Sequence, residues 1–171
     1  MGSETTDGEL RWRGRRPGGF LRRLLRAPAW VFGIGLGRFL RGRFVVVVHR
    51  GRRSGRRYET PLEVVGRRGD ELFVVSAWGR RADWVRNLEA GGLEEVWDGR
   101  RRFPATWRFP DVDEREEILA EYERRHRRAA GVFFRRLDPD YDVTDRARRR
   151  LAEGVVMVGF RPRSEGRDRS V

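Results

Sequence analysis

The sequence predicts an α+β domain that is mainly β, in which about six antiparallel strands form a small barrel with helices at its periphery. Short apolar runs rich in β-branched residues recur along the chain, and the clearest are Val45–Val48 and Val155–Phe160. Such runs are typical of buried strands when turn residues bound them. The dipeptide Asp98-Gly99 separates two further runs and predicts a two-residue hairpin turn. A short helical pattern at 82–90 follows the third run and predicts one crossover connection.

Turn and cap signals give the order of the other elements. Residues 66–70 are typical of a turn, Gly91 ends the crossover helix, and Pro110 closes a strand. Asp113 with Glu116 is a capping pattern that predicts the start of a helix. In order, we expect strands on both sides of a cationic turn at 50–57, a strand at 72–76, the helix at 82–90, strands at 94–97 and 101–109, helices after 113 and at 129–137, an acidic turn at 138–142 and a last strand at 155–160.

The length of 171 residues fits one domain with a substantial core. We expect that domain to span residues 20–162. Residues 1–19 form a polar, basic lead-in and residues 163–171 a polar tail, and both compositions predict disorder. The lead-in has no apolar core of a signal peptide, which predicts a cytoplasmic protein.

Residues 20–40 are rich in leucine, tryptophan, phenylalanine and glycine, and predict an N-terminal helix packed over the barrel. The uncharged run from Ala27 to Gly37 is too short to cross a bilayer, which takes ~20 apolar residues. The arginines at its edges leave a second interpretation open, in which this helix contacts anionic lipid peripherally at the inner face of the membrane.

Several classes of chemistry are excluded by composition. The chain has no cysteine and two histidines, His49 and His126, so we expect no metal site. All 39 basic residues are arginine, which excludes Schiff-base chemistry on lysine. A nucleophile elbow, a P-loop and a dinucleotide fingerprint are also missing. Any redox or transfer chemistry is therefore expected to come from a cofactor.

The net charge of +13 is segregated along the sequence. Residues 1–69 hold 17 arginines against 5 acidic residues, while the rest of the chain holds 22 against 21. This asymmetry indicates an anionic partner, for which a polyanionic cofactor, a membrane surface and nucleic acid are the candidates. Nucleic acid is disfavoured because residues 50–57 contain no aromatic side chain on which a base could stack.

The cationic turn itself is the strongest candidate for a binding site. Gly51 and Gly55 bracket Arg52, Arg53 and Ser54, and further arginines flank them. Glycine permits positive φ and close approach of a ligand, and guanidinium groups offer forked donors to phosphate or carboxylate oxygens. The turn therefore predicts an anion site, with a solvated arginine-rich hairpin as the alternative.

Two strings carry a family resemblance: GRRSGRRYETPL, and VVSAWGRRADWVRNLEAG further along. Together they resemble the deazaflavin-dependent nitroreductase family, small reductases that use reduced coenzyme F420. The resemblance is strong over residues 44–91 and weaker to Pro162. It implies a six-stranded split β-barrel like that of the FMN-binding split-barrel proteins. It also implies hydride transfer to a quinone, a nitro compound or an activated alkene, as in a quinone or nitro reductase.

The resemblance also implies a set of site residues. In the family the basic loop holds the phosphate and acidic tail of the cofactor. The strand end beside Trp78 is suited to one wall of a flat ring site, although a partly buried core tryptophan is the alternative. Asn87 is expected to brace the site, whereas the tyrosine that many relatives have two residues earlier is Val85 here. The full expected cofactor-binding set is Arg52, Arg53, Ser54, Gly55, Arg56, Arg57, Thr60, Pro61, Ser76, Ala77, Trp78 and Asn87.

Other points stay open at this level. Tyr122 and Tyr141 are candidates for a proton donor. FMN is the alternative cofactor, and a non-catalytic arginine-rich module that binds nucleic acid or anionic lipid is the alternative function. The sequence does not identify the small-molecule electron acceptor or the oligomeric state, for which a dimer is one option.

Overall fold

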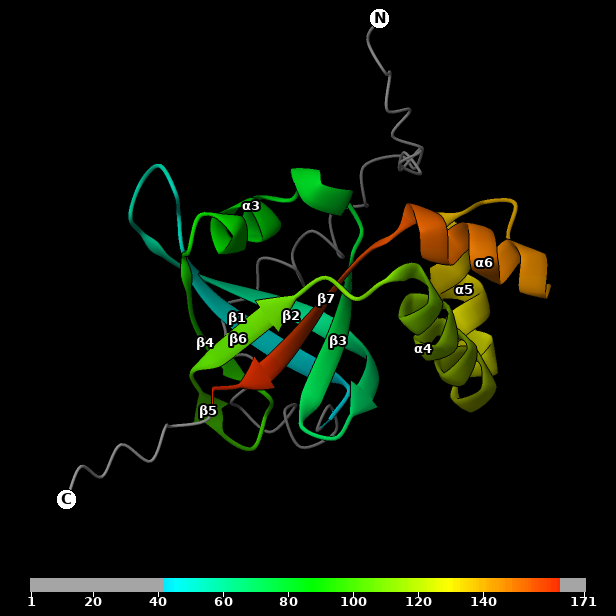
Figure 1. Cartoon of the computed structure of the whole chain (residues 1–171), viewed down its shortest axis with the longest axis horizontal. Helices are drawn as coiled ribbons and strands as arrows, with labels where there is room; N and C mark the ends of the chain where they lie inside the picture. The colour runs from blue at the N-terminus through cyan, green and yellow to red at the C-terminus, as the bar shows by residue number, and fades with distance from the viewer. Residues whose placement is uncertain (1–41, 164–171) are drawn as a thin grey trace, which may run out of the picture.

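A computed structural model describes residues 42–163 of the chain (Figure 1). The expected lead-in at 1–19, the helix at 20–40 with its membrane alternative, and the tail from residue 164 lie outside the described residues. No helix within the described part of the chain is both long and apolar enough to cross a membrane.

In the described part of the chain, seven antiparallel strands form one strongly curved sheet, in the order β5-β4-β1-β2-β3-β7-β6. Within the described residues four α-helices and one 3-10 helix accompany the sheet, which confirms the predicted α+β split barrel. The strands are β1 Phe44–Arg50, β2 Arg57–Arg68, β3 Glu71–Ser76, β4 Leu93–Trp97, β5 Arg102–Phe103, β6 Ala105–Arg108 and β7 Val156–Pro162. The helices are η2 Gly79–Arg81, α3 Asp83–Glu89, α4 Val112–Arg125, α5 Arg127–Leu137 and α6 Asp145–Gly154.

Strand β2 belongs to both halves of the barrel. Its first part pairs with β1, with Val47 opposite Thr60, and its last part pairs with β3, with Gly66 opposite Phe73. The register shifts between Val64 and Gly66, and such a bulge bends a strand. Gly66 is required at this bend because a Cβ atom there would lie 2.6 Å from Cγ2 of an isoleucine on α4.

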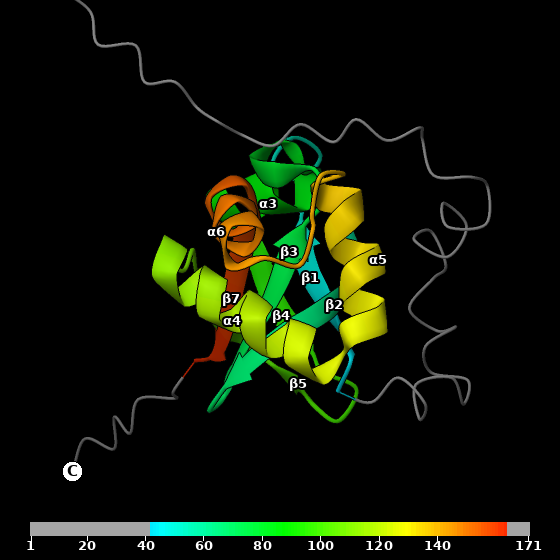
Figure 2. The ribbon, with the colours of Figure 1, turned by 90° about the vertical axis from the view of Figure 1, so that its right-hand side faces the viewer.

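Two apolar cores result from this arrangement. One fills the barrel and is closed at one end by α3, which is the predicted crossover between β3 and β4. The other lies between the outer face of the sheet and helices α4, α5 and α6, which stand in front of the strands in Figure 2. All four consecutive valines of β1 are buried, as predicted, and Val45 and Val47 belong to the core inside the barrel. The largest fully buried side chains are Phe73, Phe134, Phe160, Leu88, Ile118, Leu119, Leu151 and Met157.

The predicted strand at 101–109 is two strands, which is why the sheet has seven rather than six. Pro104 interrupts it, and proline has no N–H for a sheet ladder. Before the proline, Phe103 pairs with β4; after it, Thr106 pairs with Arg161 of β7. At this single proline the chain therefore passes from one edge strand of the sheet, β5, to the other edge strand, β6.

Three predictions of turns and caps need correction. The hairpin between β4 and β5 exists, but its loop spans residues 98–101, because the Asp98 carboxylate accepts the N–H groups of Arg100 and Arg101 at 2.9 and 3.0 Å. The turn expected at 66–70 is shorter, since β2 continues to Arg68. Helix α4 is capped by Asp111, whose side chain accepts the Glu114 N–H at 2.8 Å, rather than by Asp113.

A buried carboxylate joins three strands on the helical side of the barrel. The Glu71 side chain is 3% exposed. Its carboxylate accepts Nε and Nη2 of Arg108 on β6 at 2.7 and 3.0 Å and Nη2 of Arg161 on β7 at 3.0 Å. Burial alone would raise the pKa of Glu71, but the hydrogen bonds and charges of the two arginines outweigh it and lower the pKa below its ordinary value.

Candidate active site

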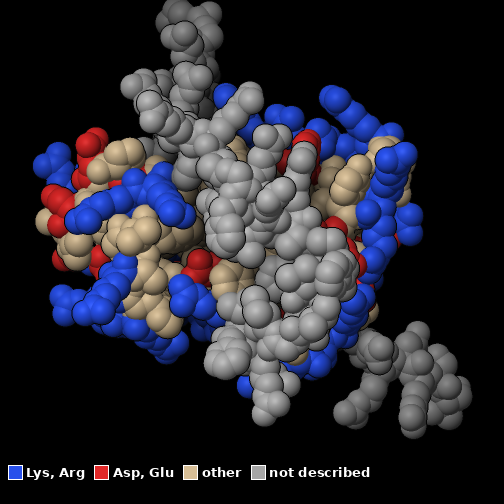
Figure 3. Space-filling model, turned by 180° about the vertical axis from the view of Figure 1, so that it is seen from behind, with Lys and Arg blue, Asp and Glu red and all other residues tan. Residues whose placement is uncertain are grey.

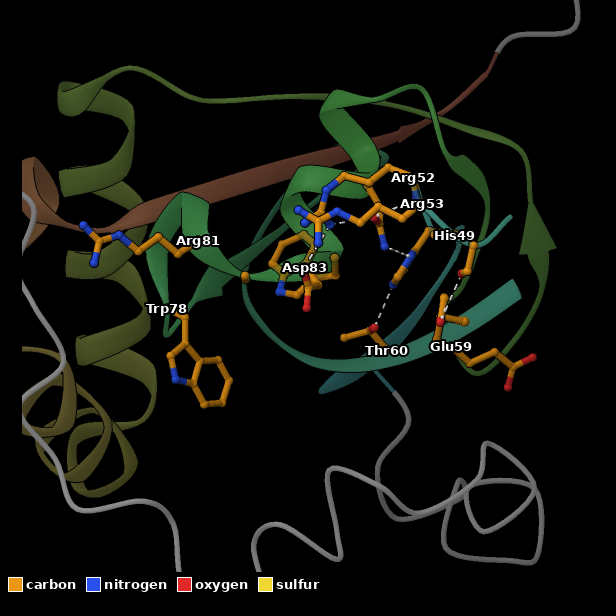
Figure 4. Close-up of a pocket in the computed structure, with 14 residues that line it drawn as sticks. His49, Arg52, Arg53, Glu59, Thr60, Trp78, Arg81 and Asp83 are labelled. Atoms are coloured by element: carbon orange, nitrogen blue, oxygen red, sulfur yellow. Dashed lines mark hydrogen bonds and ion pairs between the residues drawn. The ribbon is translucent and has the colours of Figure 1, made fainter. Parts of the chain in front are cut away.

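A cavity of about 740 Å³ lies at one end of the barrel, between the loop at 51–56 and helix α3 (Figure 4). Residues of β1, β2, η2 and α3 complete its walls. The lining residues are His49, Gly51, Arg52, Arg53, Ser54, Tyr58, Glu59, Thr60, Trp78, Arg81, Ala82, Asp83, Trp84 and Asn87.

The loop between β1 and β2 has a closed, internally bonded shape. The Gly51 N–H donates to the Arg56 carbonyl and the Gly55 N–H to the Gly51 carbonyl, both at 2.8 Å. Gly55 has φ of +64°, which disfavours any residue with a side chain. A Cβ atom on Gly51 would lie 2.7 Å from both Ser54 Oγ and Tyr58 Cε2. The two glycines are therefore needed for different reasons, one for its dihedral angle and one for close packing.

Arg52 and Arg53 line the cavity but differ in their contacts. Arg52 Nη1 donates to Asp83 at 3.0 Å and to Asn87 Oδ1 at 3.1 Å, and its backbone N–H also donates to Asn87 Oδ1 at 3.1 Å. The Arg53 guanidinium makes no hydrogen bond or ion pair with any other residue in the 42–163 range. Figure 4 shows both side chains reaching from the loop over the part of the cavity where Asp83 lies. Arg53 is therefore the loop cation available to an anionic ligand.

Arg56 and Arg57 do not line the cavity. Arg57 belongs to an ion-pair network on the outer surface of the sheet, with contacts of 2.7 Å to Glu59, 3.3 Å to Glu94 and 3.1 Å to Glu95. The Arg56 side chain is exposed and has no carboxylate partner among the described residues. The turn thus directs its arginines to two different surfaces.

His49 and Asn87 form the buried wall of the cavity and are 3% and 4% exposed. Asn87 Nδ2 donates to His49 Nδ1 at 3.1 Å, and His49 Nε2 lies 2.9 Å from Thr60 Oγ1. The Tyr58 ring stacks on the His49 ring with centroids 5.8 Å apart, and its hydroxyl lies 3.3 Å from Ser54 Oγ. Burial lowers the pKa of His49, and the charges of Asp83 and Glu94 oppose this only in part, so the ring is neutral near neutral pH.

The charges on the cavity wall do not cancel. Asp83 pairs with Arg52, and Glu59 pairs with Arg57 on the outer surface. This leaves Arg53 and Arg81 as lining cations without a carboxylate partner among residues 42–163. Arginine side chains also gather elsewhere on the surface, on both sides of the face seen in Figure 3. The cavity differs from that general surface because its cations surround a concave site.

Comparison with known proteins decides the family. A protein-family model described as F420H(2)-dependent quinone reductase matches residues 26–150. The chain belongs to this family. The resemblance noted from the two sequence strings is thereby confirmed, and the family uses F420H2 to reduce small-molecule acceptors.

The solved structures that resemble this member of the F420H2-dependent quinone reductase family have low sequence identity to it. One is described as an F420-H2 dependent reductase, with 19% identity, a TM-score of 0.45, and coverage of 70% of this chain and 93% of that chain. Another is a candidate 5-nitroimidazole antibiotic resistance protein from Bacteroides thetaiotaomicron, with 14% identity, a TM-score of 0.44, and coverage of 72% and 75%. A third is described as a domain-swapped dimer, with 18% identity, a TM-score of 0.49, and coverage of 82% and 92%. No curated protein matches the chain.

The expected site residues of this family member divide into two groups. Those that line the cavity are Arg52, Arg53, Ser54, Thr60, Trp78 and Asn87. Those that do not are Gly55, Arg56, Arg57, Pro61, Ser76 and Ala77. Ser76 is 4% exposed and donates from its hydroxyl to the Gly79 carbonyl at 2.8 Å, which shapes the turn that carries Trp78.

Neither candidate proton donor lines the cavity. The Tyr122 hydroxyl donates to Glu63 and the Tyr141 hydroxyl to Glu123, each at 2.8 Å. Both rings lie in the core between the sheet and the helices. Burial, followed by the bond to a carboxylate, raises the pKa of both phenols. The structure therefore places these hydroxyls in structural hydrogen bonds away from the cavity.

Several lining residues were missed from the sequence, and simple periodicity signals point to two of them. Tyr58 is two residues before Thr60 on β2, and alternate residues share one face of a strand. Asp83 is four residues before Asn87 on α3, and such pairs share one face of a helix. The missed residues are His49, Tyr58, Glu59, Arg81, Ala82, Asp83 and Trp84.

Proposed function

We propose that this protein is a reductase that binds F420H2 in the cavity and transfers a hydride to a quinone, a nitro compound or an activated alkene. Membership of the F420H(2)-dependent quinone reductase family supports this proposal. The observation that carries it to this cavity is the Arg53 guanidinium, which lines a concave site without a carboxylate partner in the described residues. A phosphate or tail carboxylate of the cofactor would complete its hydrogen bonds.

The residues of the cavity fit such a cofactor. Arg53, with Arg52 and the Ser54 hydroxyl beside it, would hold the anionic part at the loop. Trp78, half exposed on the turn after β3, offers a flat apolar face for a ring system. The cofactor supplies the hydride, and the protein binds, orients and shields it from water. None of these tasks requires a nucleophilic side chain, which agrees with the composition.

Turnover is the direct test. Reduced F420 is mixed with the protein and then with menadione, a model nitro compound or an enone, and the absorbance of the oxidised deazaflavin is followed by stopped flow. We expect oxidation well above the rate without protein for at least one acceptor. A parallel series with reduced FMN separates the two cofactors. Tight binding of F420H2 without its oxidation by any acceptor would contradict the reductase proposal. Turnover with reduced FMN but not with F420H2 would identify FMN as the cofactor instead.

The position of the ring can be tested by tryptophan emission. We expect F420 binding to quench the emission of the wild-type protein, and Trp78→Phe to reduce the fractional quench clearly, because the indole lines the cavity. Trp107→Phe is the matched control, since this residue lies on β6 outside the cavity and packs edge-on against Phe109. An unchanged quench in Trp78→Phe would place the ring elsewhere.

A further inference from the structure

A chain of hydrogen bonds runs from the loop at 51–56 into the barrel. It begins with two N–H groups of Arg52, passes through the Asn87 amide and the His49 ring, and ends at the Thr60 hydroxyl. These residues come from the loop, α3, β1 and β2, four segments that meet at the cavity. The middle pair is buried, so water cannot replace either partner easily.

The hydrogen bonds determine how each group must be oriented. Asn87 Oδ1 accepts the backbone N–H of Arg52 and its Nη1, so this atom is the amide oxygen and the Nδ2 group faces His49. An amide nitrogen only donates, and therefore His49 Nδ1 is an unprotonated acceptor. The ring proton of the neutral side chain is then on Nε2, which donates to Thr60 Oγ1 at 2.9 Å.

Protonation of His49 is incompatible with this arrangement. An Nδ1–H would face the Nδ2–H of Asn87, and rotation of the amide to relieve the conflict would remove Oδ1 from both N–H groups of Arg52. The loop would lose the contacts that dock it on α3. The charged or titratable side chains on the elements around His49 are Arg50 on β1, Arg52 and Arg53 on the loop, Tyr58 and Glu59 on β2, Asp83 on α3, and Glu94 and Glu95 on β4.

We propose that His49 is a positioning residue whose neutral Nε2–H tautomer holds Asn87, and through Asn87 the docked conformation of Arg52, so that the loop presents its cations to an anion in the cavity. The residue acts through Asn87 and does not touch the reacting atoms. The proposal rests on the proposed function only for the identity of the physiological anion. We call the hydrogen-bonded chain from Arg52 through Asn87 and His49 to Thr60 the relay. The relay requires only that the loop binds an anion.

The first test measures the ring directly. In the ¹⁵N-labelled wild-type protein, NMR of the imidazole nitrogens is expected to show Nε2 protonated and Nδ1 free at pH 7.5. In Asn87→Asp the carboxylate at this place accepts from Nδ1–H, so the His49 pKa is expected to rise above its wild-type value. A wild-type ring with the proton on Nδ1, or a His49 titration that Asn87→Asp leaves unchanged, would overturn the proposal.

The second test measures anion affinity, with sulfate as the probe because it is a dianion throughout the pH range used. In His49→Leu, which removes the acceptor, we expect the sulfate dissociation constant to rise roughly five- to tenfold through loss of about one buried hydrogen bond. In His49→Asn, whose side-chain oxygen can replace Nδ1 as acceptor, we expect less than a roughly twofold change. As the pH falls and the His49 ring becomes protonated, the affinity of the wild-type protein for sulfate is expected to decrease. The affinity of His49→Asn for sulfate is not expected to show this pH dependence.

Equal sulfate affinity in wild type, His49→Leu and His49→Asn would overturn the proposal, as would stronger binding when the ring is protonated. If His49→Leu does not fold, the ring NMR and the Asn87→Asp titration decide the matter alone. Sulfate binding that depends on His49 in a protein that does not bind F420H2 would support the relay and contradict the proposed function. F420H2 turnover that is unaffected by loss of the His49 acceptor would instead support the proposed function and contradict the relay.

Discussion

Replacing Arg53 by alanine is expected to weaken F420H2 binding by roughly ten- to a hundredfold, the cost of about 1.5–3 kcal/mol for one charge-assisted hydrogen bond. Arg53 lines the cavity, and its guanidinium has no other partner within residues 42–163. Fluorescence titrations at about 0.05 M and 0.5 M salt measure the effect. We expect most of the loss to persist at the higher salt, because a direct contact is screened much less than a distant charge.

Arg56→Ala is the matched control. It removes an arginine from the same loop, but this one is exposed and does not line the cavity. We expect less than a roughly threefold loss of affinity, and we expect high salt to abolish it. Losses of equal size in the two variants, both abolished by salt, would indicate that the loop acts only as a diffuse positive surface. The solvated-hairpin interpretation of the turn would then be the better one.

Replacing Glu71 by alanine is expected to lower the free energy of unfolding by about 3 kcal/mol, as measured by urea denaturation at pH 7. Removing one partner of a buried ion pair typically costs ~3–5 kcal/mol because the other charge is left without compensation. The lower end applies because Arg108 keeps its contact with Glu114 at 2.6 Å. The variant would also weaken the contact between β3 and the strands β6 and β7.

Glu117→Ala is the control for a surface ion pair, since its contact with Arg68 is exposed on both sides. We expect a change of less than about 0.5 kcal/mol. The two variants should also differ with pH. Because the pKa of Glu71 is lowered in the folded protein, its contribution is fully present above about pH 4.5 and is lost as the pH falls through the lowered pKa. A Glu71→Gln variant whose stability shows the same acid-side slope as wild type would contradict this assignment.

The sequence predicted the elements whose signals are local. The valine run of β1, the glycine that ends α3 and the strand β7 were expected where they lie. The split at Pro104 was not expected, because β5 and β6 pair with strands distant from one another in the sheet. Helix α6 was not expected either. Its apolar face consists mainly of Ala147, Leu151 and Ala152 within an arginine-rich segment, and its cap at Thr144 becomes apparent only once the preceding turn is known.

The part of the site that is contiguous in sequence was predictable. The part that depends on side-chain direction, or on contacts between distant residues, was less so. The loop glycines and the lining arginines belong to one string, whose composition indicates an anion site. Composition does not show in which direction each side chain of a tight turn points, so Arg57 was expected in the site although it faces the outer surface. His49 was missed as a site residue because its role depends on Asn87, which is 38 residues away.

The split at Pro104 also affects how this protein meets other chains. In an open sheet the two outermost strands present backbone N–H and C=O groups to which another polypeptide can add a strand. Here the two outermost strands have only 2 and 4 residues, and the proline between them has no N–H to offer. The described barrel therefore presents very little backbone for edge-to-edge aggregation, although its strands are rich in valine.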